Sequence, residues 1–240
     1  MTYVITDLHG EYEKFKELLA CIRFSDEDTL YVGGDTCDRG AQSAGLYLDM
    51  MDRKNVLAIL GNHEMMALRH LERVLRQHHE EGVCLLDIFS QEELHNWLEN
   101  GGDATLISLF DQPKEDQYRI LSYIQSLPLY RTVEVGDTRY VLVHGGLGDE
   151  GEKVENPEDV DPYDLVWSRP DFDSTYFANE PNTRLLVGHT PTFLMQRFRE
   201  PARIYYGKGN VIALDCGAAY PKCLGRLSCL CLETGEEWYV

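Results

Sequence analysis

The sequence predicts an α/β fold, and three features lead to this class. Short apolar runs alternate with stretches of helical periodicity over the first sixty residues, as in parallel strands joined by helical crossovers. A mostly helical stretch follows, and the last third returns to strand patterns. The 240-residue chain is 43% hydrophobic and 26% charged, which is ordinary for a globular protein with a sizeable core.

The first sixty residues are expected to form three parallel strands. Apolar runs at 3–6, 30–32 and 56–60 predict these strands. Apolar residues recur at helical spacing over 12–22 and 44–51, which predicts an amphipathic helix in each connection.

Residues 65–127 are interpreted as a helical insertion within one domain of residues 1–240, because neither end has the composition of a linker. Inside it, Ser90-Gln-Glu-Glu has the pattern of a capping box and predicts that a helix begins there. After it, Gly136-Asp137 predicts a hairpin. Further strands are expected at 185–187, 204–206, 211–214 and 227–232.

Charge and cysteine content limit the classes of partner and compartment. The net charge is −19, which disfavours nucleic acid and anionic membrane as partners. No apolar run approaches the ~20 residues that span a bilayer, and no signal peptide is visible. Seven cysteines, an odd number without paired Cys-x-x-Cys spacing, favour reduced thiols and a cytoplasmic location.

Five polar segments follow predicted strands, at the positions where sites form in α/β proteins. The segments are Asp7-Leu-His9-Gly10, Gly34-Asp35-Thr-Cys-Asp38-Arg39-Gly40, Gly61-Asn62-His63-Glu64, His144-Gly145-Gly146 and Gly188-His189-Thr190.

The donor types in these segments suit divalent metals. Asp7 and His9 are two residues apart on one loop, so both can reach one ion. A further carboxylate, an amide oxygen and two imidazoles are supplied by Asp35, Asn62, His144 and His189. Mixed nitrogen and oxygen donors suit Mn, Fe or Zn. Six donors exceed one tetrahedral ion but suffice for two ions that share a carboxylate, an arrangement suited to attack on phosphorus.

Taken together, these motifs resemble those of the PPP-type phosphoprotein phosphatases within the calcineurin-like metallophosphoesterases, nearest the compact bacterial and bacteriophage-type serine/threonine enzymes. The likeness covers nearly the whole chain. It includes Trp97-Leu-Glu-Asn-Gly-Gly-Asp103, Trp167-Ser-Arg169 and Leu214-Asp-Cys-Gly217. One departure is Thr6, where the family usually has glycine. The resemblance implies two packed β-sheets flanked by helices, an αββα sandwich.

The resemblance also implies a role for each residue. Asp7 and His9 would bind the first metal, Asp35 would bridge both ions, and Asn62, His144 and His189 would complete the second site. A metal-bridging hydroxide would attack the phosphorus. His63 would act as general acid, oriented and kept protonated by Asp38. Arg39 and Arg169 would hold phosphate oxygens; a structural ion pair between Arg39 and Asp38 is the alternative.

The expected activity is metal-dependent hydrolysis of phosphate monoesters by a serine/threonine phosphoprotein phosphatase that uses two divalent ions, with manganese favoured and iron or zinc as alternatives. A hydrolase of dinucleoside polyphosphates such as diadenosine tetraphosphate is the alternative, because that related group shares the metal motifs. A non-catalytic binding scaffold is disfavoured, since every expected ligand and His63 are present. The physiological substrate and the oligomeric state are left open.

Overall fold

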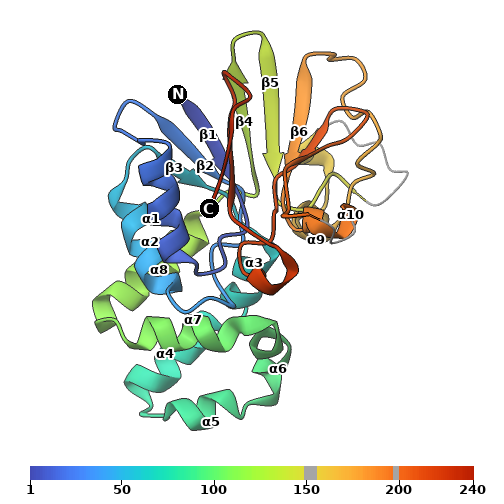
Figure 1. Cartoon of the computed structure of the whole chain (residues 1–240). Helices are drawn as coiled ribbons and strands as arrows, with labels where there is room; N and C mark the ends of the chain where they lie inside the picture. Colours follow the sequence, from blue (N-terminus) through green and yellow to red (C-terminus); the bar gives the residue numbers. More distant parts are fainter. Residues whose placement is uncertain (149–155, 197–199) are drawn as a thin grey trace.

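The computed structural model of the chain describes residues 1–148, 156–196 and 200–240, and within them the elements follow the order that Figure 1 colours along the chain. The strands are β1 Thr2–Ile5, β2 Thr29–Val32, β3 Val56–Ala58, β4 Tyr130–Val135, β5 Thr138–Val143, β6 Thr183–Val187, β7 Tyr205–Tyr206, β8 Val211–Ala213, β9 Ser228–Cys231 and β10 Glu237–Tyr239. The α-helices are α1 Tyr12–Cys21, α2 Ser43–Asp52, α3 Asn62–Leu68, α4 Leu71–Glu80, α5 Leu85–Phe89, α6 His95–Trp97, α7 Asp103–Phe110, α8 Lys114–Ser126, α9 Pro162–Trp167 and α10 Thr192–Met195.

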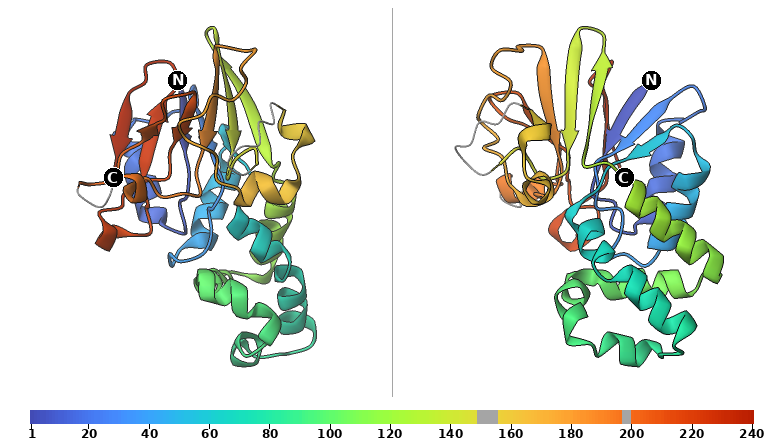
Figure 2. Two further views of the ribbon diagram at one scale, coloured as in Figure 1. Left: turned by 90° about the vertical axis from the view of Figure 1, so that its right-hand side faces the viewer. Right: turned by 180° about the vertical axis from the view of Figure 1, so that it is seen from behind.

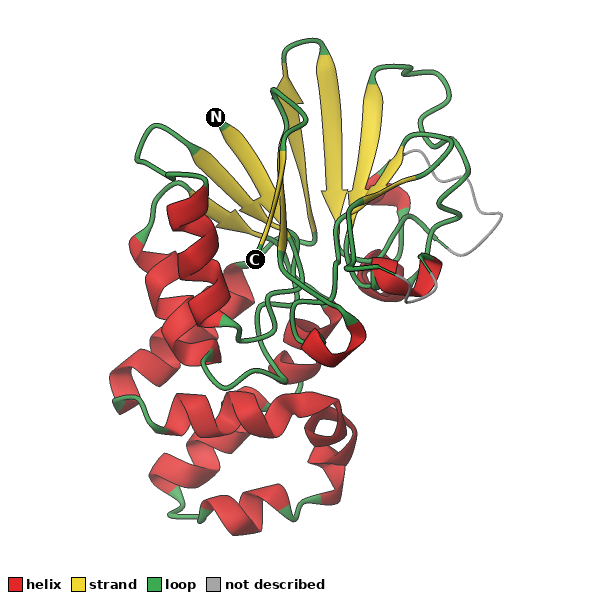
Figure 3. Cartoon of the chain, in the orientation of Figure 1, coloured by secondary structure: helices red, strands yellow, loops and turns green. Residues whose placement is uncertain are grey.

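The strands form two five-stranded mixed sheets. The first has the order β10-β9-β1-β2-β3, with β1, β2 and β3 parallel as the sequence predicts. The second has the order β4-β5-β6-β8-β7 and contains the expected β4–β5 hairpin. The parallel strands of both sheets end on the side that faces the helical segment (Figure 3). The loops that leave them therefore meet at one edge.

Alternating side chains along the strands produce the layers of the fold. In β1, Val4 points between the two sheets while Ile5 packs under α1 and α2. In β5, Leu142 joins the core between the sheets, whereas Val141 and Val143 pack on the opposite face. Successive residues of a strand point to opposite faces, so β1 and β5 bury apolar side chains on both sides. The expected two-sheet sandwich with flanking helices is confirmed.

All residues between β3 and β4 that lie in regular structure are helical, from α3 to α8. Figure 2 shows α4 to α7 projecting beyond one end of the sheets, while α8 lies beside α2. The segment has its own apolar core, to which Leu71, Trp97 and Leu106 contribute. We propose that it belongs to one domain of residues 1–240, because α7 and α8 pack directly on α2.

The helix expected after Ser90 is present as consecutive helical turns from Glu92 to Gly102, but the expected cap is wrong. Ser90 follows the last residue of α5, and its hydroxyl donates to the carbonyl of Asp87 at 2.8 Å. A serine side chain that can cap a helix N-terminus can also donate to a carbonyl of the preceding turn, and here it donates to a carbonyl of α5. The seven cysteines are all free thiols. Among the described residues, no helix combines the length and apolarity that crossing a bilayer requires.

Candidate metal centre

Loops that follow β1, β2, β3, β5 and β6 converge at one edge of the two sheets. They carry, in this order, Asp7 with His9, then Asp35, Asn62, His144 and His189. The close approach depends on glycine: a Cβ on Gly61 would stand 2.3 Å from Asp35 Oδ1, and one on Gly188 would stand 2.3 Å from Asp7 Oδ2. No side chain fits at either position without moving the carboxylate.

Two overlapping groups of donor atoms could each hold a metal ion. One contains His9, Asp35 and His63, and the other contains Asp35, His144 and His189, with the donor atoms of each group within 4.8 Å of one another. Asp35 belongs to both, with Oδ2 at 3.7 Å from His9 Nε2 and Oδ1 at 3.3 Å from His144 Nε2. A carboxylate shared by two groups could serve two ions at once.

Asn62 completes the second group. Its Oδ1 lies 2.9 Å from His144 Nε2 and 2.9 Å from His189 Nδ1. His144 Nδ1 lies 2.8 Å from the carbonyl of Gly33, which only accepts, so Nδ1 carries the proton. In a neutral ring, Nε2 then directs a lone pair at Asn62 Oδ1 and at Asp35. Atoms with lone pairs that face one another in this way require a proton or a cation between them.

The pKa shifts of His144 and His189 are also consistent with a cation between these side chains. Burial lowers the pKa of His144, but Asp35, with smaller contributions from Asp7 and the Gly33 carbonyl, outweighs this and raises it to about 10. Burial, together with His144, lowers the pKa of His189 to about 3, so this ring is neutral. A divalent cation can take the place of the proton on His144, since metal-binding imidazoles are deprotonated. The residues present therefore fit a metal.

His9 presents its Nε2 to the site in the same manner. Its Nδ1 bonds the carbonyl of Cys37 at 2.9 Å, so the proton sits on Nδ1. Nε2 accepts from the Arg39 guanidinium at 2.5 Å, which is consistent with a lone pair there. Burial lowers the pKa of His9 well below its usual value, and the ring is neutral.

Asp7 lies beside these groups and is part of neither. Its Oδ2 accepts from the Thr6 hydroxyl at 2.6 Å, and both carboxylate oxygens lie 3.2 Å from the backbone amide of His189. Burial, followed by the neighbouring Asp215, raises the pKa of Asp7 well above its usual value. A cation nearby would offset that cost. The expected role of Asp7 as a ligand stays a prediction.

His63, which belongs to the first group, forms a buried pair with Asp38. His63 Nδ1 lies 2.7 Å from Asp38 Oδ2, and the ring lies 4.7 Å from that of His9. Burial lowers the pKa of His63, but Asp35 and Asp38 outweigh this, and the net shift is upward. The pair thus has the geometry and the pKa direction of a proton donor oriented by a carboxylate.

The donor groups open into a cavity of about 410 Å³. Its wall includes Arg39 and Arg169 together with Trp167, Phe193 and Tyr220. Arg39 donates to His63 Nε2 at 3.0 Å and stacks on the ring of Tyr220, so the alternative of an ion pair with Asp38 is not what the structure records. Arg169 is anchored through Nε to the Thr190 hydroxyl at 3.2 Å.

Backbone strain is concentrated in these loops. Six residues of the site adopt positive φ angles without being glycine: Asp7 at 54°, His9 at 43°, Asp35 at 51°, Asp38 at 69°, Arg39 at 67° and His189 at 64°. Each such conformation costs roughly 1–3 kcal/mol and persists only where the surroundings impose it. Strain of this kind gathers at functional sites.

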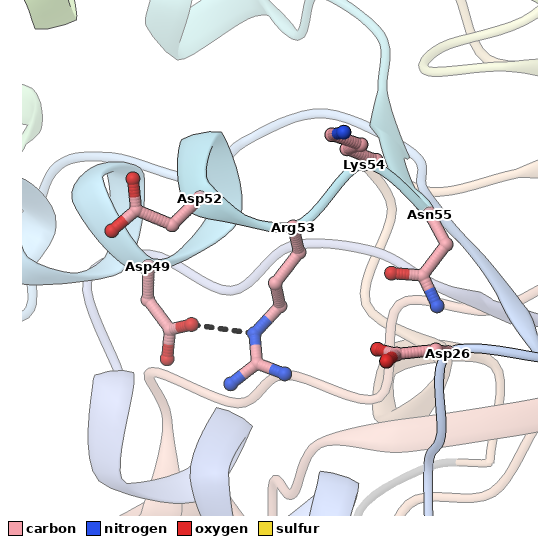
Figure 4. A pocket seen from close by; sticks show the side chains of 6 residues that line it. All are labelled: Asp26, Asp49, Asp52, Arg53, Lys54 and Asn55. Atoms are coloured by element: carbon pink, nitrogen blue, oxygen red, sulfur yellow. Dashed lines mark hydrogen bonds and ion pairs between the residues drawn. The ribbon is translucent and has the colours of Figure 1, made fainter.

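A larger hollow of about 610 Å³ lies elsewhere, near the turn between α2 and β3. Asp49 and Arg53 in its wall pair with each other at 2.5 Å (Figure 4). None of the metal-binding candidates lines it. Its size therefore does not make it the candidate site, and the metal-binding candidates line the smaller cavity.

Comparison with known proteins agrees with the geometry of the site. The family model for the calcineurin-like phosphoesterases matches residues 2–218, and the chain belongs to this family of hydrolases. The family commonly carries two metal ions, and the His and Asp groups described above are suited to them.

The chain is similar to proteins of two activities. Serine/threonine-protein phosphatase 1 of Salmonella typhimurium is 26% identical over 220 residues, 91% of this chain and 87% of that protein. The symmetrical bis(5'-nucleosyl)-tetraphosphatase of Sodalis glossinidius is 36% identical over 100 residues, 40% of this chain and 36% of that protein. A crystal structure of a protein proposed to be a diadenosine tetraphosphatase has a TM-score of 0.66 at 16% identity and covers 100% of this chain and 92% of that one.

Sequence reasoning missed the residues that hold these side chains in place. The buried carboxylate of Glu64 accepts from the backbone amides of Asp35 and Gly61, each at 2.9 Å. Trp97 and Thr105 reach Asp38 from the helical segment. Glu64 is the last residue of the motif Gly61-Asn62-His63-Glu64, and it was the one charged residue of that motif without an expected role. That could have indicated a structural function. Nothing local marks Thr105, which is 67 residues from its partner.

Proposed function

We propose that the protein is a serine/threonine phosphoprotein phosphatase. The observation that carries this proposal is the His63–Asp38 pair, 2.7 Å apart, because His63 lines the cavity together with Asp35, Asn62 and Arg39 while Asp38 holds it from behind. A proton donor, metal-type ligands and a phosphate-binding cation in one cavity are the parts that hydrolysis of a phosphate monoester needs.

The metals would be held by the residues that the sequence motifs single out. Asp7 and His9 would serve one ion, Asn62, His144 and His189 the other, with Asp35 between them. When bound, the two ions supply an activated water and neutralise charge on the phosphoryl group. Manganese is the proposed metal, with iron and zinc as alternatives, because the donors are nitrogen and oxygen without a thiolate.

His63 would protonate the leaving oxygen. A serine or threonine alkoxide is a poor leaving group, and a positioned acid is worth about 10²–10⁴ in rate. In the structure, Nε2 accepts from Arg39. When Arg39 turns to the phosphate oxygens, Nε2 can carry a proton, and Asp38 holds Nδ1–H and stabilises the cation.

Arg39 and Arg169 would bind the phosphate. Both line the cavity, and a planar guanidinium suits two oxygens of one phosphoryl group. The stacking of Arg39 on Tyr220 and the bond from Arg169 to Thr190 restrict where each guanidinium can move.

Hydrolysis of dinucleoside polyphosphates is the second candidate, and the likeness to the symmetrical tetraphosphatase favours it. Two observations support the phosphoprotein instead. The likeness to the serine/threonine phosphatase extends over 91% of this chain. The described wall of the cavity offers two cationic side chains, which suit one phosphoryl group better than a chain of four.

The substrate is tested by measuring kcat/KM for a phosphoserine peptide, a phosphothreonine peptide and diadenosine tetraphosphate with manganese present. We expect the phosphopeptides to be the better substrates. A kcat/KM for diadenosine tetraphosphate that exceeds both by tenfold or more would replace the proposal with the second candidate.

The role of His63 is tested with His63→Asn. Turnover of a phosphoserine peptide should fall by about 10²–10⁴-fold. Hydrolysis of p-nitrophenyl phosphate should fall less, because that phenolate leaves readily without a proton. Metal content, measured by elemental analysis, should not change. Equal losses on both substrates together with a metal deficit would make His63 a supporting residue of the metal site.

A further inference from the structure

The motif Trp97-Leu-Glu-Asn-Gly-Gly-Asp103 has no task in the function proposed so far, yet it lies against the loop that carries Asp38. The Trp97 indole Nε1 donates to Asp38 Oδ2 at 2.9 Å. The carbonyl of Gly101 accepts from the backbone amide of Arg39 at 3.1 Å. Gly102 leaves room for the Trp97 indole, because a Cβ on Gly102 would stand 2.5 Å from Trp97 Nε1.

A second residue of the helical segment holds the other oxygen of the same carboxylate. Thr105, in α7, donates from Oγ1 to Asp38 Oδ1 at 2.7 Å. Its Oγ1 also accepts from the backbone amide of Asp38 at 2.8 Å. The threonine hydroxyl thus contacts both the backbone and the side chain of Asp38, and the carboxylate cannot rotate without breaking its bonds to Thr105 and Trp97.

All of these groups are removed from water. Asp38 and Thr105 are fully buried, and Trp97 and His63 are 1% exposed. Solvent cannot replace a lost donor at this position, so the orientation of the carboxylate depends on the two side chains themselves. Asp38 Oδ2 accepts from Trp97 and from His63 together, and the direction of the His63 ring follows from where that oxygen stands.

We propose that Trp97 and Thr105 are positioning residues of the reaction, which act on His63 through Asp38. The helical segment thereby holds the proton donor in the orientation in which Nε2 faces the cavity. This inference rests on the proposed function, because it assigns a consequence to the proton that His63 donates.

The test is a double-mutant cycle between Trp97→Phe and His63→Asn, read on a phosphoserine peptide and on p-nitrophenyl phosphate. Phenylalanine keeps an aromatic ring in the core but removes the N–H donor together with the five-membered ring, so the control variant must lose the same volume. Loss of a buried bond to a charged group should lower kcat on the phosphopeptide by about 10- to 100-fold. KM should stay within about twofold, and the aryl substrate should lose less.

The cycle separates positioning from general loosening of the structure. In the His63→Asn background, Trp97→Phe should cost no further activity, since the proton donor is already absent. Trp238→Phe is the matched control, because that indole packs on Tyr3 in the other core and should leave kcat unchanged. Thr105→Val should lower kcat on the phosphopeptide as Trp97→Phe does. Thr105→Ser, which keeps the hydroxyl, should have nearly the kcat of the parent.

Three results would overturn the inference. Trp97→Phe and Thr105→Val with unchanged kcat would remove the positioning role while the proposed function stands. Equal losses in the parent and His63→Asn backgrounds would make the effect one of fold stability. No effect of His63→Asn itself on either substrate would remove the proposed proton donor, and with it this inference.

Discussion

Replacement of Glu64 by glutamine tests how the metal-binding loops are held together. The Glu64 carboxylate is fully buried at the start of α3, and it accepts five hydrogen bonds between 2.7 and 3.2 Å. Three go to Oε1 and two to Oε2. The donors are the backbone amides of Asp35, Thr36, Cys37 and Gly61 and the hydroxyl of Tyr47.

The cost of Glu64→Gln follows from this count. Glutamine has one acceptor oxygen, and the least damaging orientation keeps it opposite the three donors of Oε1. Its NH₂ group then faces the amides of Asp35 and Gly61, so two buried donors lose their acceptor. At about 1–3 kcal/mol for each, the free energy of unfolding should fall by about 2–6 kcal/mol. In proteins of this size, 1 kcal/mol corresponds to roughly 2–4 °C in Tm.

Urea unfolding followed by far-UV circular dichroism measures this loss, with the metal concentration held fixed. Glu72→Gln on the exposed face of α4 is the control, and it should stay within about 0.5 kcal/mol of the parent. A Glu64→Gln protein within about 1 kcal/mol of the parent, at an unchanged m-value, would refute the reasoning, because the carboxylate would then not be what joins the loops.

Three further predictions concern the metals. Activity should be lost on chelation and return with added manganese; full turnover in a preparation shown by elemental analysis to be metal-free would exclude a metal mechanism. Asp35→Asn should reduce metal content more than Asp38→Asn, because Asp35 belongs to both donor groups while Asp38 contacts His63, Trp97 and Thr105; the reverse order, measured by elemental analysis, would mean that the roles are exchanged. Thr6→Val should weaken metal binding about tenfold in calorimetry, since Thr6 orients Asp7, whereas Thr36→Val removes a buried hydroxyl that has no partner among the described residues and should change it less than twofold; equal effects of the two changes would contradict a role for Thr6.

The sheets and the position of the site could be predicted from the sequence because both depend on local patterns. Apolar runs predicted the three parallel strands β1, β2 and β3, and glycines beside polar residues indicated where each strand ends. The five loops meet because the parallel strands of each sheet end at the same edge and the two sheets pack with these edges on the same side. That Asp35 lies in both donor groups agrees with its expected bridging role.

The contacts between distant segments could not be predicted in this way. Trp97 lies 59 residues from Asp38, and no periodicity indicates that an indole N–H is directed at a carboxylate. Ser90 illustrates the same limit at short range, because its hydroxyl can serve either end of a helix and tertiary context decides. The grouping of His63, and not Asp7, with His9 and Asp35 likewise depends on side-chain directions that spacing does not encode.

The left-handed residues of the loops have a consequence for how such a protein changes under selection. Arg39 is exposed and has φ 67°, so glycine at this position would relieve strain without opening a gap in the core. Selection for heat tolerance alone should therefore favour Arg39→Gly, and the same change would remove a proposed phosphate ligand. The most stable descendants of this chain and its most active ones are expected to differ first in these loops, while the sheets behind them stay the same.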